Sequence, residues 1–151
     1  MQHITPFLWF DGQAEKAMNF YVSIFGNSRI LGVTRGPGGN AMSVTADLDG
    51  QEIMAFNAGP EFKFTEAISF FVNCETQEEV DELWARLSEG GEEGRCGWLK
   101  DQYGLSWQII PAVLGELMGD KDPEKAGRVM QAMLQMNKID IAGLRKAYDH
   151  Q

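Results

Sequence analysis

The order of predicted elements in this chain repeats once, and that repeat constrains the fold more than any other feature. A buried strand, an amphipathic helix and three further strands are predicted within residues 1–59, and the same order returns within 60–111. In each copy the helix shows apolar residues at helical spacing directly after an apolar strand. The sequence therefore predicts an α+β fold built from two βαβββ modules, at about 3–59 and 60–111.

Local signals mark where several of these elements begin and end. Asp11 could supply the N-cap of the first helix, and Asp49-Gly50 is a strong signal for a two-residue hairpin turn. Thr76 and Glu79 have the spacing of a capping box at the start of the second helix. The opening strands of the two modules are predicted at 3–10 and 64–74.

After residue 111 the composition changes to residues that favour helices. A short helix is predicted first, and Asp122-Pro123 then has the form of a helix start, with Asp as the cap and Pro in the first turn. The last two helices carry apolar stripes rich in methionine, which favour packing in a core or an oligomer over a functional role. The chain is expected to form a two-module domain over 1–119 and a helical tail over 120–151.

The charge balance bears on the partners of the chain. Its 151 residues include 22 acidic and 13 basic side chains, a formal net charge of −9. Such a surface repels phosphate backbones and anionic lipid, which argues against nucleic acid and membrane as partners. The sequence has no run of about 18 apolar residues and no signal-peptide pattern at its start. Cys74 and Cys96 lack CxxC spacing, which favours reduced thiols in the cytoplasm over a structural disulfide.

No familiar catalytic set can be assembled from these residues. The two histidines, His3 and His150, lie at the two ends of the sequence, which argues against Cys-His and Ser-His-Asp arrangements. The Gly/Pro-rich segment 36–39 lies between two predicted strands. It therefore does not have the strand-to-helix position of a loop that binds nucleotide or S-adenosylmethionine.

Several stretches resemble a known superfamily. The helix AEKAMNFYVSIFG and the closing hairpin KDQYGLSWQIIP, within two βαβββ modules, resemble the vicinal oxygen chelate superfamily of glyoxalases, bleomycin-resistance proteins and extradiol dioxygenases. PFLWFDGQAEKAMNFYVSIFGNSRI and FNAGPEFKFTEAISFFVNCETQEEVDELW are similar to its PhnB-like, demethylubiquinone methyltransferase-like subgroup. The resemblance covers about residues 3–119. It implies cupped sheets that half enclose a cavity and a homodimer, with modules paired within or between chains.

The resemblance also implies four positions at which metal-dependent members carry His or Glu ligands. In this chain they fall at Pro6, Met54, Ala67 and Gln108. The first three side chains cannot bind a metal, and a neutral amide is a weak ligand beside a carboxylate. Glu52 would share the strand face of Met54, but one carboxylate does not make a metal site. The chain is therefore expected to hold no metal and no cofactor.

Strand alternation predicts which side chains face the cavity. The predicted set combines apolar and aromatic side chains with a few polar groups, which is typical of a small-molecule site, although the same residues could fill a closed core. Gln108 keeps hydrogen-bonding ability without a charge, so it is the main candidate for orienting a ligand. The candidate ligand-binding residues are Leu8, Phe10, Met54, Phe56, Ser69, Phe71, Trp98, Ser106 and Gln108.

Two functional hypotheses follow. The leading one is a metal-free small-molecule binding protein, since metal-free members of the superfamily include proteins that sequester antibiotics. The alternative is a metal-independent lyase, isomerase or transferase that acts on a small substrate in the same cavity through Gln108, Ser69 or Asn57. A purely structural dimer would bind no ligand. Asp101, next to the candidate site, is interpreted as a turn-forming residue.

Overall fold

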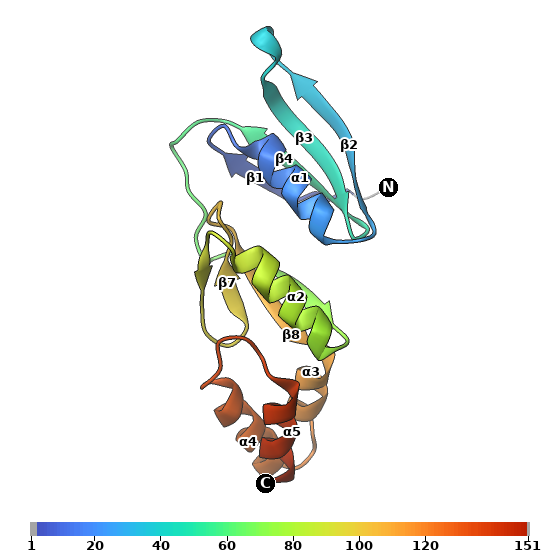
Figure 1. Cartoon of the computed structure of the whole chain (residues 1–151), viewed down its shortest axis with the longest axis vertical. Helices are drawn as coiled ribbons and strands as arrows, with labels where there is room; N and C mark the ends of the chain where they lie inside the picture. The colour runs from blue at the N-terminus through green and yellow to red at the C-terminus, as the bar shows by residue number, and fades with distance from the viewer. Residues whose placement is uncertain (1–2, 151) are drawn as a thin grey trace. The chain divides into compact units, whose positions relative to one another are not determined.

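The computed structural model describes residues 3–150, and the chain divides into two compact units, Met1–Phe64 and Thr65–Gln151. Each unit contains a four-stranded mixed sheet and a helix, and the second unit also carries three C-terminal helices. Figure 1 follows the chain from blue through green in the first unit to red at the C-terminus. The predicted α+β fold of two βαβββ modules with C-terminal helices is confirmed.

The first unit contains one helix between its first and second strands. Its elements are β1 (Phe7–Phe10), α1 (Ala14–Ile24), β2 (Ser28–Arg35), β3 (Ala41–Leu48) and β4 (Gln51–Asn57). The strand order is β1-β4-β3-β2, with β1 parallel to β4 and the other neighbours antiparallel. Asp49 and Gly50 both take positive φ in the predicted turn between β3 and β4, as this hairpin type requires.

Helix α1 covers one face of this sheet and packs on β3 and β4. Small and apolar residues recur on the inner side of the helix, so its backbone can approach the strands closely. The buried residues of this core are Ala14, Ala17, Met18 and Tyr21 from the helix and Leu8, Phe10, Val44, Ala46, Leu48, Ile53 and Ala55 from the strands.

The second unit repeats the arrangement, with shorter counterparts of β2, β3 and β4. Its elements are β5 (Ser69–Cys74), α2 (Gln77–Ser88), β6 (Glu92–Glu93), β7 (Trp98–Lys100) and β8 (Ser106–Pro111). The order β5-β8-β7-β6 matches that of the first sheet, and β5 runs parallel to β8. Two modules with the same strand order and the same parallel pair agree with the repeat seen in the sequence.

Helix α2 begins with the predicted capping box. The backbone N–H of Glu79 donates to Thr76 Oγ1 at 3.2 Å, and the Glu79 carboxylate accepts from the Glu75 N–H at 2.7 Å. The helix packs on β7 and β8 and buries Val80, Trp84 and Leu87 against them. The apolar positions at helical spacing therefore form the core of the second unit.

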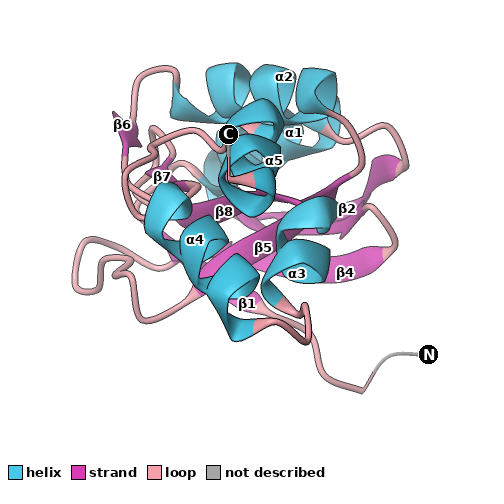
Figure 2. Ribbon diagram, turned by 90° about the horizontal axis from the view of Figure 1, so that it is seen from below, coloured by secondary structure: helices cyan, strands magenta, loops and turns pink. Residues whose placement is uncertain are grey.

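Three C-terminal helices form a cluster with its own small core (Figure 2). They are α3 (Ala112–Met118), α4 (Pro123–Met133) and α5 (Ile141–Asp149). Asp122 caps α4 as predicted, because its Oδ1 accepts from the Glu124 N–H at 3.0 Å. The core of the cluster is Ile110, Leu114, Val129, Ile139 and Leu144, with Met118, Met133 and Met136 among the residues packed against it.

The structure corrects three predicted boundaries. β1 begins at Phe7 and not at residue 3, and β5 begins at Ser69 and not at 64, because the strand register with β4 and β8 starts at these residues. Asp11 does not cap α1: the N-cap is Gln13, and the Ala14 N–H donates instead to Asn57 Oδ1 at 2.9 Å.

None of the helices in the described part of the chain is both long and apolar enough to cross a membrane.

Candidate functional site

The candidate site lies on the face of the second sheet opposite to α2. Register places Phe71 of β5 beside Gln108 of β8, and Gln108 beside Trp98 of β7, so the three side chains share one face. The alternate residues of β8, Trp107 and Ile109, are 1% and 0% exposed on the helix-covered face. Three predicted site residues from three strands are thus brought side by side, with the amide between two aromatic rings.

Gln108 is held by a second predicted residue. Its Nε2 donates to Ser69 Oγ at 3.0 Å, across the parallel β5–β8 pair. This bond fixes the orientation of the amide and uses one of its two N–H groups. The bond to Ser69 is the hydrogen bond that the structure gives to the Gln108 side chain within the described residues. It also sets the direction of the carbonyl oxygen and of the second N–H of the amide.

A cavity of about 400 Å³ lies over this face of the sheet. Such a volume suits a small organic molecule. One wall consists of strand residues, and the other of residues from α3 and α4. The lining residues are Phe71, Asn73, Cys96, Trp98, Gln108, Ile110, Pro111, Ala112, Leu114, Gly115, Met118 and Met133.

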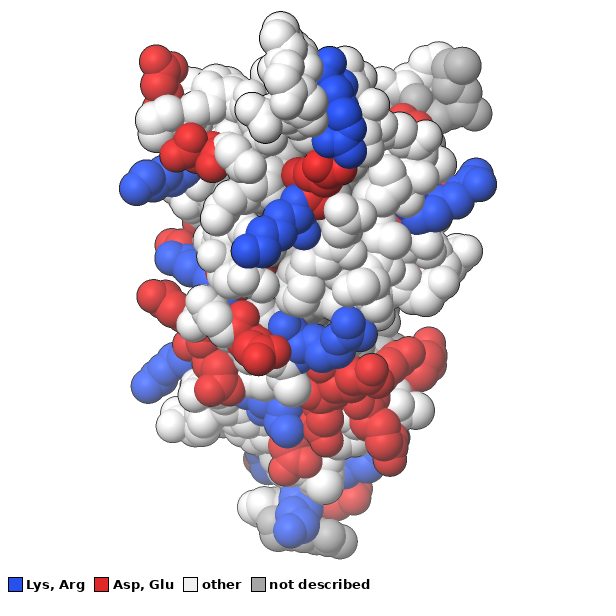
Figure 3. Space-filling model, turned by 45° about the horizontal axis from the view of Figure 1, so that its top comes forward, with Lys and Arg blue, Asp and Glu red and all other residues white. Residues whose placement is uncertain are grey.

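The cavity wall carries no Asp, Glu, Lys, Arg or His side chain. Its polar groups are the amides of Asn73 and Gln108 and the thiol of Cys96. The charge of this unit lies elsewhere, since 16 of the 22 acidic residues and nine of the 13 basic residues fall in 65–151. Figure 3 shows acidic side chains gathered over one part of the surface. The unit thus combines a net acidic composition with an uncharged cavity wall.

The buried carboxylate of Asp101 holds β8 in place. Asp101 is 2% exposed, and its Oδ1 accepts from the N–H groups of Tyr103 at 2.8 Å and Leu105 at 3.1 Å. Its Oδ2 accepts from Trp107 Nε1 at 2.9 Å. The predicted turn-forming role is confirmed, and the bond to Trp107 extends it into the strand that carries Gln108.

Ser106, another predicted site residue, shares the face of Gln108 but lies outside the cavity. It is 0% exposed, and its Oγ has no hydrogen-bond partner among the described residues. It lines a separate hollow of about 120 Å³ beside Lys100, which forms an ion pair with Glu66. The hydrogen bond from Lys100 lowers the pKa of Glu66. Lys100 therefore has an ionic partner on the protein surface.

The first sheet divides the remaining predicted residues between its two faces. The parallel register pairs Phe7 with Met54 and Trp9 with Phe56, so these four side chains share the face opposite to α1. The predicted positions of Met54 and Phe56 on one face agree with this arrangement. Leu8 and Phe10, each 3% exposed, lie instead on the face that α1 covers.

The placement of Leu8 and Phe10 beside Met54 and Phe56 was therefore wrong. The reason is register, because β1 is offset by one residue from the predicted alternation and each such step exchanges the two faces. Phe10 packs edge to face on Phe64, with ring centroids 5.4 Å apart, within the first unit. Both residues are core residues of the first module.

Asn57 has a structural role and does not line the cavity. Its Oδ1 accepts from the first N–H of α1, and its Nδ2 donates to the Ala41 carbonyl at 3.0 Å. Both ends of the amide are thus used by backbone groups. Asn57 fixes the start of α1 against β3 and β4.

The structure also adds residues that the sequence did not indicate as site residues. Asn73 and Cys96 line the cavity from the sheet and from the loop before β7, and Leu114, Gly115, Met118 and Met133 line it from the tail. For the methionines of the tail, the sequence predicted only packing in a core or an oligomer. Cys96 takes a φ of 59°, in a left-handed backbone conformation that the sequence did not indicate.

The four positions implied for metal ligands do not form a cluster of metal-binding side chains. Met54 and Gln108 lie on the faces of their respective sheets opposite to α1 and α2, while Ala67 precedes β5. Across residues 3–150, no three His, Cys, Asp or Glu side chains are grouped so that they could hold a metal ion.

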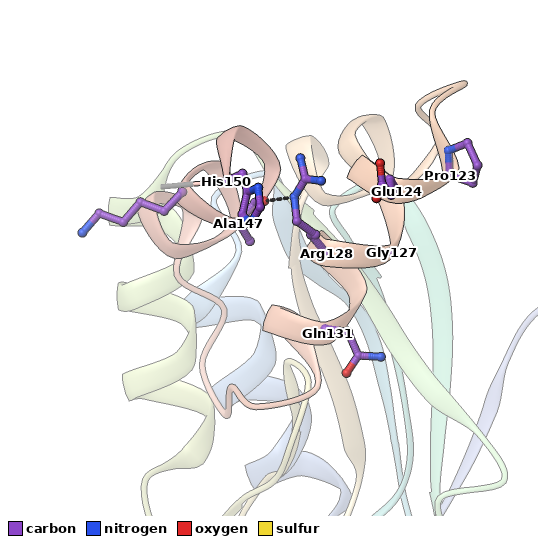
Figure 4. Close-up of a pocket in the computed structure, with 8 residues that line it drawn as sticks. Pro123, Glu124, Gly127, Arg128, Gln131, Ala147 and His150 are labelled. Carbon is purple, nitrogen blue, oxygen red and sulfur yellow. Dashed lines mark hydrogen bonds between the residues drawn. The ribbon is translucent and has the colours of Figure 1, made fainter.

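A second hollow, of about 470 Å³, lies between α4 and α5 (Figure 4). Arg128 stands at its centre and donates to the carbonyls of Ala147 at 2.9 Å and Tyr148 at 2.7 Å. The guanidinium thus satisfies the C-terminal carbonyls of α5. Although this hollow is the larger one, its main polar group is engaged in holding two helices together, so we place the candidate site on the second sheet.

The two βαβββ modules, each with its own helix packed on one face of its sheet, define the glyoxalase/bleomycin resistance/dioxygenase class of fold. A family model described as 3-demethylubiquinone-9 3-methyltransferase matches residues 2–110. The chain therefore belongs to this PhnB-like family within that superfamily. The match ends inside β8 and leaves α3, α4 and α5 outside it.

Solved structures agree with this assignment. A PhnB protein from Bacillus cereus, named after the same methyltransferase family, is 39% identical with a TM-score of 0.70, over 74% of this chain and 100% of that chain. PA1353 from Pseudomonas aeruginosa is 18% identical with a TM-score of 0.60, over 73% and 96%. The fosfomycin resistance protein FosX from Listeria monocytogenes is 15% identical with a TM-score of 0.53, over 77% and 97%. The last two show the fold alone. Among curated proteins, none matches the sequence significantly.

Proposed function

We propose that this protein binds a small organic molecule, without a metal ion, in the cavity on the face of the second sheet opposite to α2. The observation that carries the proposal is the grouping of Phe71, Gln108 and Trp98 across three adjacent strands, on the wall of a 400 Å³ cavity. Aromatic side chains supply contact area with little conformational freedom to lose, and a fixed amide supplies orientation.

The exposure of Phe71 supports a binding role. Its side chain is 54% exposed although it lies on a strand in a sheet. A large apolar side chain that stays in contact with solvent gains free energy when a ligand covers it, at about 25 cal/mol per Å² of apolar surface. A core-packing residue would already have gained this free energy in the folded chain.

The competing function is turnover of such a molecule by a metal-independent lyase, isomerase or transferase. Gln108 and Ser69 are the hydrogen-bonded polar pair that could act on it, whereas Asn57 is engaged by backbone groups. The name of the family describes methyl transfer to a demethylated ubiquinone. The Gly/Pro-rich segment forms a short turn, Pro37–Gly39, between β2 and β3, so it offers no strand-to-helix loop for a methyl donor.

A homodimer in the cytoplasm fits the same proposal. Phe7 is 54% exposed on a sheet face that also carries Trp9, Met54 and Phe56, and a second copy would cover this apolar face. Both cysteines are free thiols, as expected in a reducing compartment. Sedimentation velocity of Phe7→Glu should show a shift from dimer to monomer, whereas Met130→Glu, at an exposed position of α4, should leave the dimer intact.

Ligand binding is tested by thermal shift against a metabolite library and by mass spectrometry of compounds released from the purified protein. Phe71→Ala should weaken binding of any hit by about tenfold, because it removes a stacking partner. Phe62→Ala, at another exposed phenylalanine, in the first unit, should leave binding unchanged. A library without hits and a purified protein without bound compound would contradict the proposal, as would one tightly held divalent ion per chain.

A further inference from the structure

We infer that the C-terminal helices complete the ligand site, and that the site takes an uncharged molecule with a flat ring. This inference rests on the proposed function and deepens it, since it names the wall that closes the cavity and the chemical class that fits between its walls. The helices α3 to α5 lie beyond the region that matches the family model, so the wall they form lies outside the matched region.

The helical cluster is fixed to the second module at two places. Gln77, at the start of α2, donates from Nε2 to the Ile139 carbonyl at 3.0 Å and accepts from the Ile141 N–H at 2.8 Å. In the loop before β7, the N–H groups of Cys96 and Gly97 donate to the carbonyls of Met136 and Asn137, each at 2.8 Å. These bonds join the tail to the same loop that leads into Trp98. The two walls of the cavity are therefore held in one arrangement.

The tail supplies the apolar end of the cavity. Leu114, Gly115 and Met118 come from α3, and Met133 comes from α4. Methionine side chains adapt to irregular shapes, which suits a wall that contacts a ligand. Gly115 leaves open space in this wall, since a Cβ built there would meet no atom within 4 Å. Without α3 and α4 the aromatic face of the sheet would have no opposite wall.

The charge of the ligand follows from the lining residues. No Asp, Glu, Lys, Arg or His lines the cavity, and an ionised group placed there would lose its hydration without gaining a partner charge. The surrounding unit is acidic, which disfavours anions further. Carboxylates and phosphates are therefore disfavoured, and a neutral molecule is preferred.

The shape of the ligand follows from the strand register. Phe71 and Trp98 stand on the two strands that flank Gln108, so their backbones are separated by about 10 Å, or two interstrand spacings. A flat ring with atoms in contact on both faces needs about 7 Å. A flat ring that lies over the Gln108 amide can contact Phe71 on one side and Trp98 on the other. A hydroxyl or carbonyl on the ring would meet the amide.

The test uses 2-naphthol as a neutral flat probe, with two matched comparisons. The carboxylate 2-naphthoate keeps the ring system and adds a charge, and decahydro-2-naphthol keeps the hydroxyl and loses the flat ring. Titration calorimetry at pH 7 on the full-length protein should give at least tenfold weaker binding for each comparison compound. Equal binding of 2-naphthoate, or no binding of 2-naphthol, would overturn the ligand class.

The tail wall is tested with Gly115→Leu in the full-length chain. The new side chain enters open space, and leucine favours a helix more than glycine does, so the fold should be retained. Binding of 2-naphthol should fall at least tenfold. Gly127→Leu is the matched control, because its Cβ also meets no atom within 4 Å but it lines the hollow between α4 and α5. Its binding should equal that of the wild type, and circular dichroism and Tm verify that both variants fold.

The outcomes separate the inference from the proposed function. Binding that survives in Gly115→Leu but is lost in Phe71→Ala would overturn the tail wall and leave the sheet as the binding site. Binding lost in Gly127→Leu and retained in Gly115→Leu would place the probe between α4 and α5 and overturn the inference. A natural compound released from the purified protein that carries a net charge would overturn the ligand class while supporting small-molecule binding.

Discussion

At the residue scale, one carboxylate connects a turn to the candidate site. Asp101 satisfies two backbone N–H groups of the turn before β8 and the indole N–H of Trp107 within that strand. Trp107 and Gln108 are neighbours on opposite faces of β8, so the fixed indole helps to hold the strand from which the Gln108 amide projects. The buried charge is stabilised by three donors, which is the usual requirement for a carboxylate without solvent.

Asp101→Ala is expected to destabilise the protein by about 3 kcal/mol, because it leaves buried donors without an acceptor. Urea unfolding followed by tryptophan fluorescence measures the change in free energy. Asp11→Ala is a suitable control, since Asp11 is exposed and does not cap α1. A change below about 0.5 kcal/mol in Asp101→Ala would show that the three bonds contribute little.

The Cys74 thiol gives a pH-dependent prediction. Burial raises its pKa from 9.0 to about 11, and the negative charge of Glu79 adds to the effect. Because the pKa is higher in the folded state, the protonated thiol contributes its full stabilisation below about pH 9. This contribution is lost as the pH rises from about 9 to about 11. A two-unit difference corresponds to about 2.7 kcal/mol.

Cys74→Ala removes this titration, so the difference in unfolding free energy between wild type and variant should narrow by about 2 to 3 kcal/mol between pH 8.5 and 11. Urea unfolding at both pH values measures it. The difference cancels the titration of tyrosine and lysine side chains, which both proteins share. A difference that stays constant with pH would contradict the raised pKa.

At the element scale, the start of α2 has two functions. Thr76 and Glu79 cap its first turn, while Gln77 extends its amide to the segment that leads into α5. The amide satisfies one carbonyl and one N–H that lie outside any helix or strand bond. The helix that covers one face of the second sheet is thus also the anchor for the tail that covers part of the other face.

Gln77→Ala is expected to destabilise the second unit by about 2 kcal/mol, because it removes the bonds to Ile139 and Ile141 and leaves both backbone groups unpaired. Hydrogen exchange should become faster in α5 and in the segment before it. Gln131→Ala provides a control, since Gln131 lines the hollow between α4 and α5 on the surface of the tail. Unchanged exchange in α5 of Gln77→Ala would show that the anchor lies elsewhere.

At the scale of the whole molecule, the second unit is an extended version of the module found in the first. Its sheet shares a core with the tail, because Ile110 at the end of β8 packs with Leu114, Val129, Ile139 and Leu144. The family match ends at Ile110. The tail therefore continues the last strand of the shared fold directly, without a linker.

Leu144→Ala should create a cavity in this shared core and cost about 3 kcal/mol, since Leu144 is fully buried. Hydrogen exchange followed by mass spectrometry should show faster exchange in α3, α4, α5 and the end of β8. The strands β1 to β4 serve as the internal reference. Leu134→Ala, at a partly exposed position after α4, is the control and should have little effect.

The sequence by itself determined the repeated βαβββ order, the capping box of α2, the Asp-Gly hairpin and the start of α4, because these depend on local spacing and local backbone chemistry. It also predicted that Phe71 and Gln108 point to the cavity side of their strands, since alternation along β5 and β8 separates the two faces of each strand. Each of these features follows from residues within a few positions of one another.

The tertiary structure decided the rest. The parallel pairing of Phe7 with Met54 placed Leu8 and Phe10 under α1, because register between distant strands is set by pairing across more than forty residues. It also placed Gly115, Met118 and Met133 opposite Gln108, although the sequence indicated only their packing. Contacts between distant segments decide which surfaces pack together, and a local sequence pattern does not specify the distant segment on which it packs.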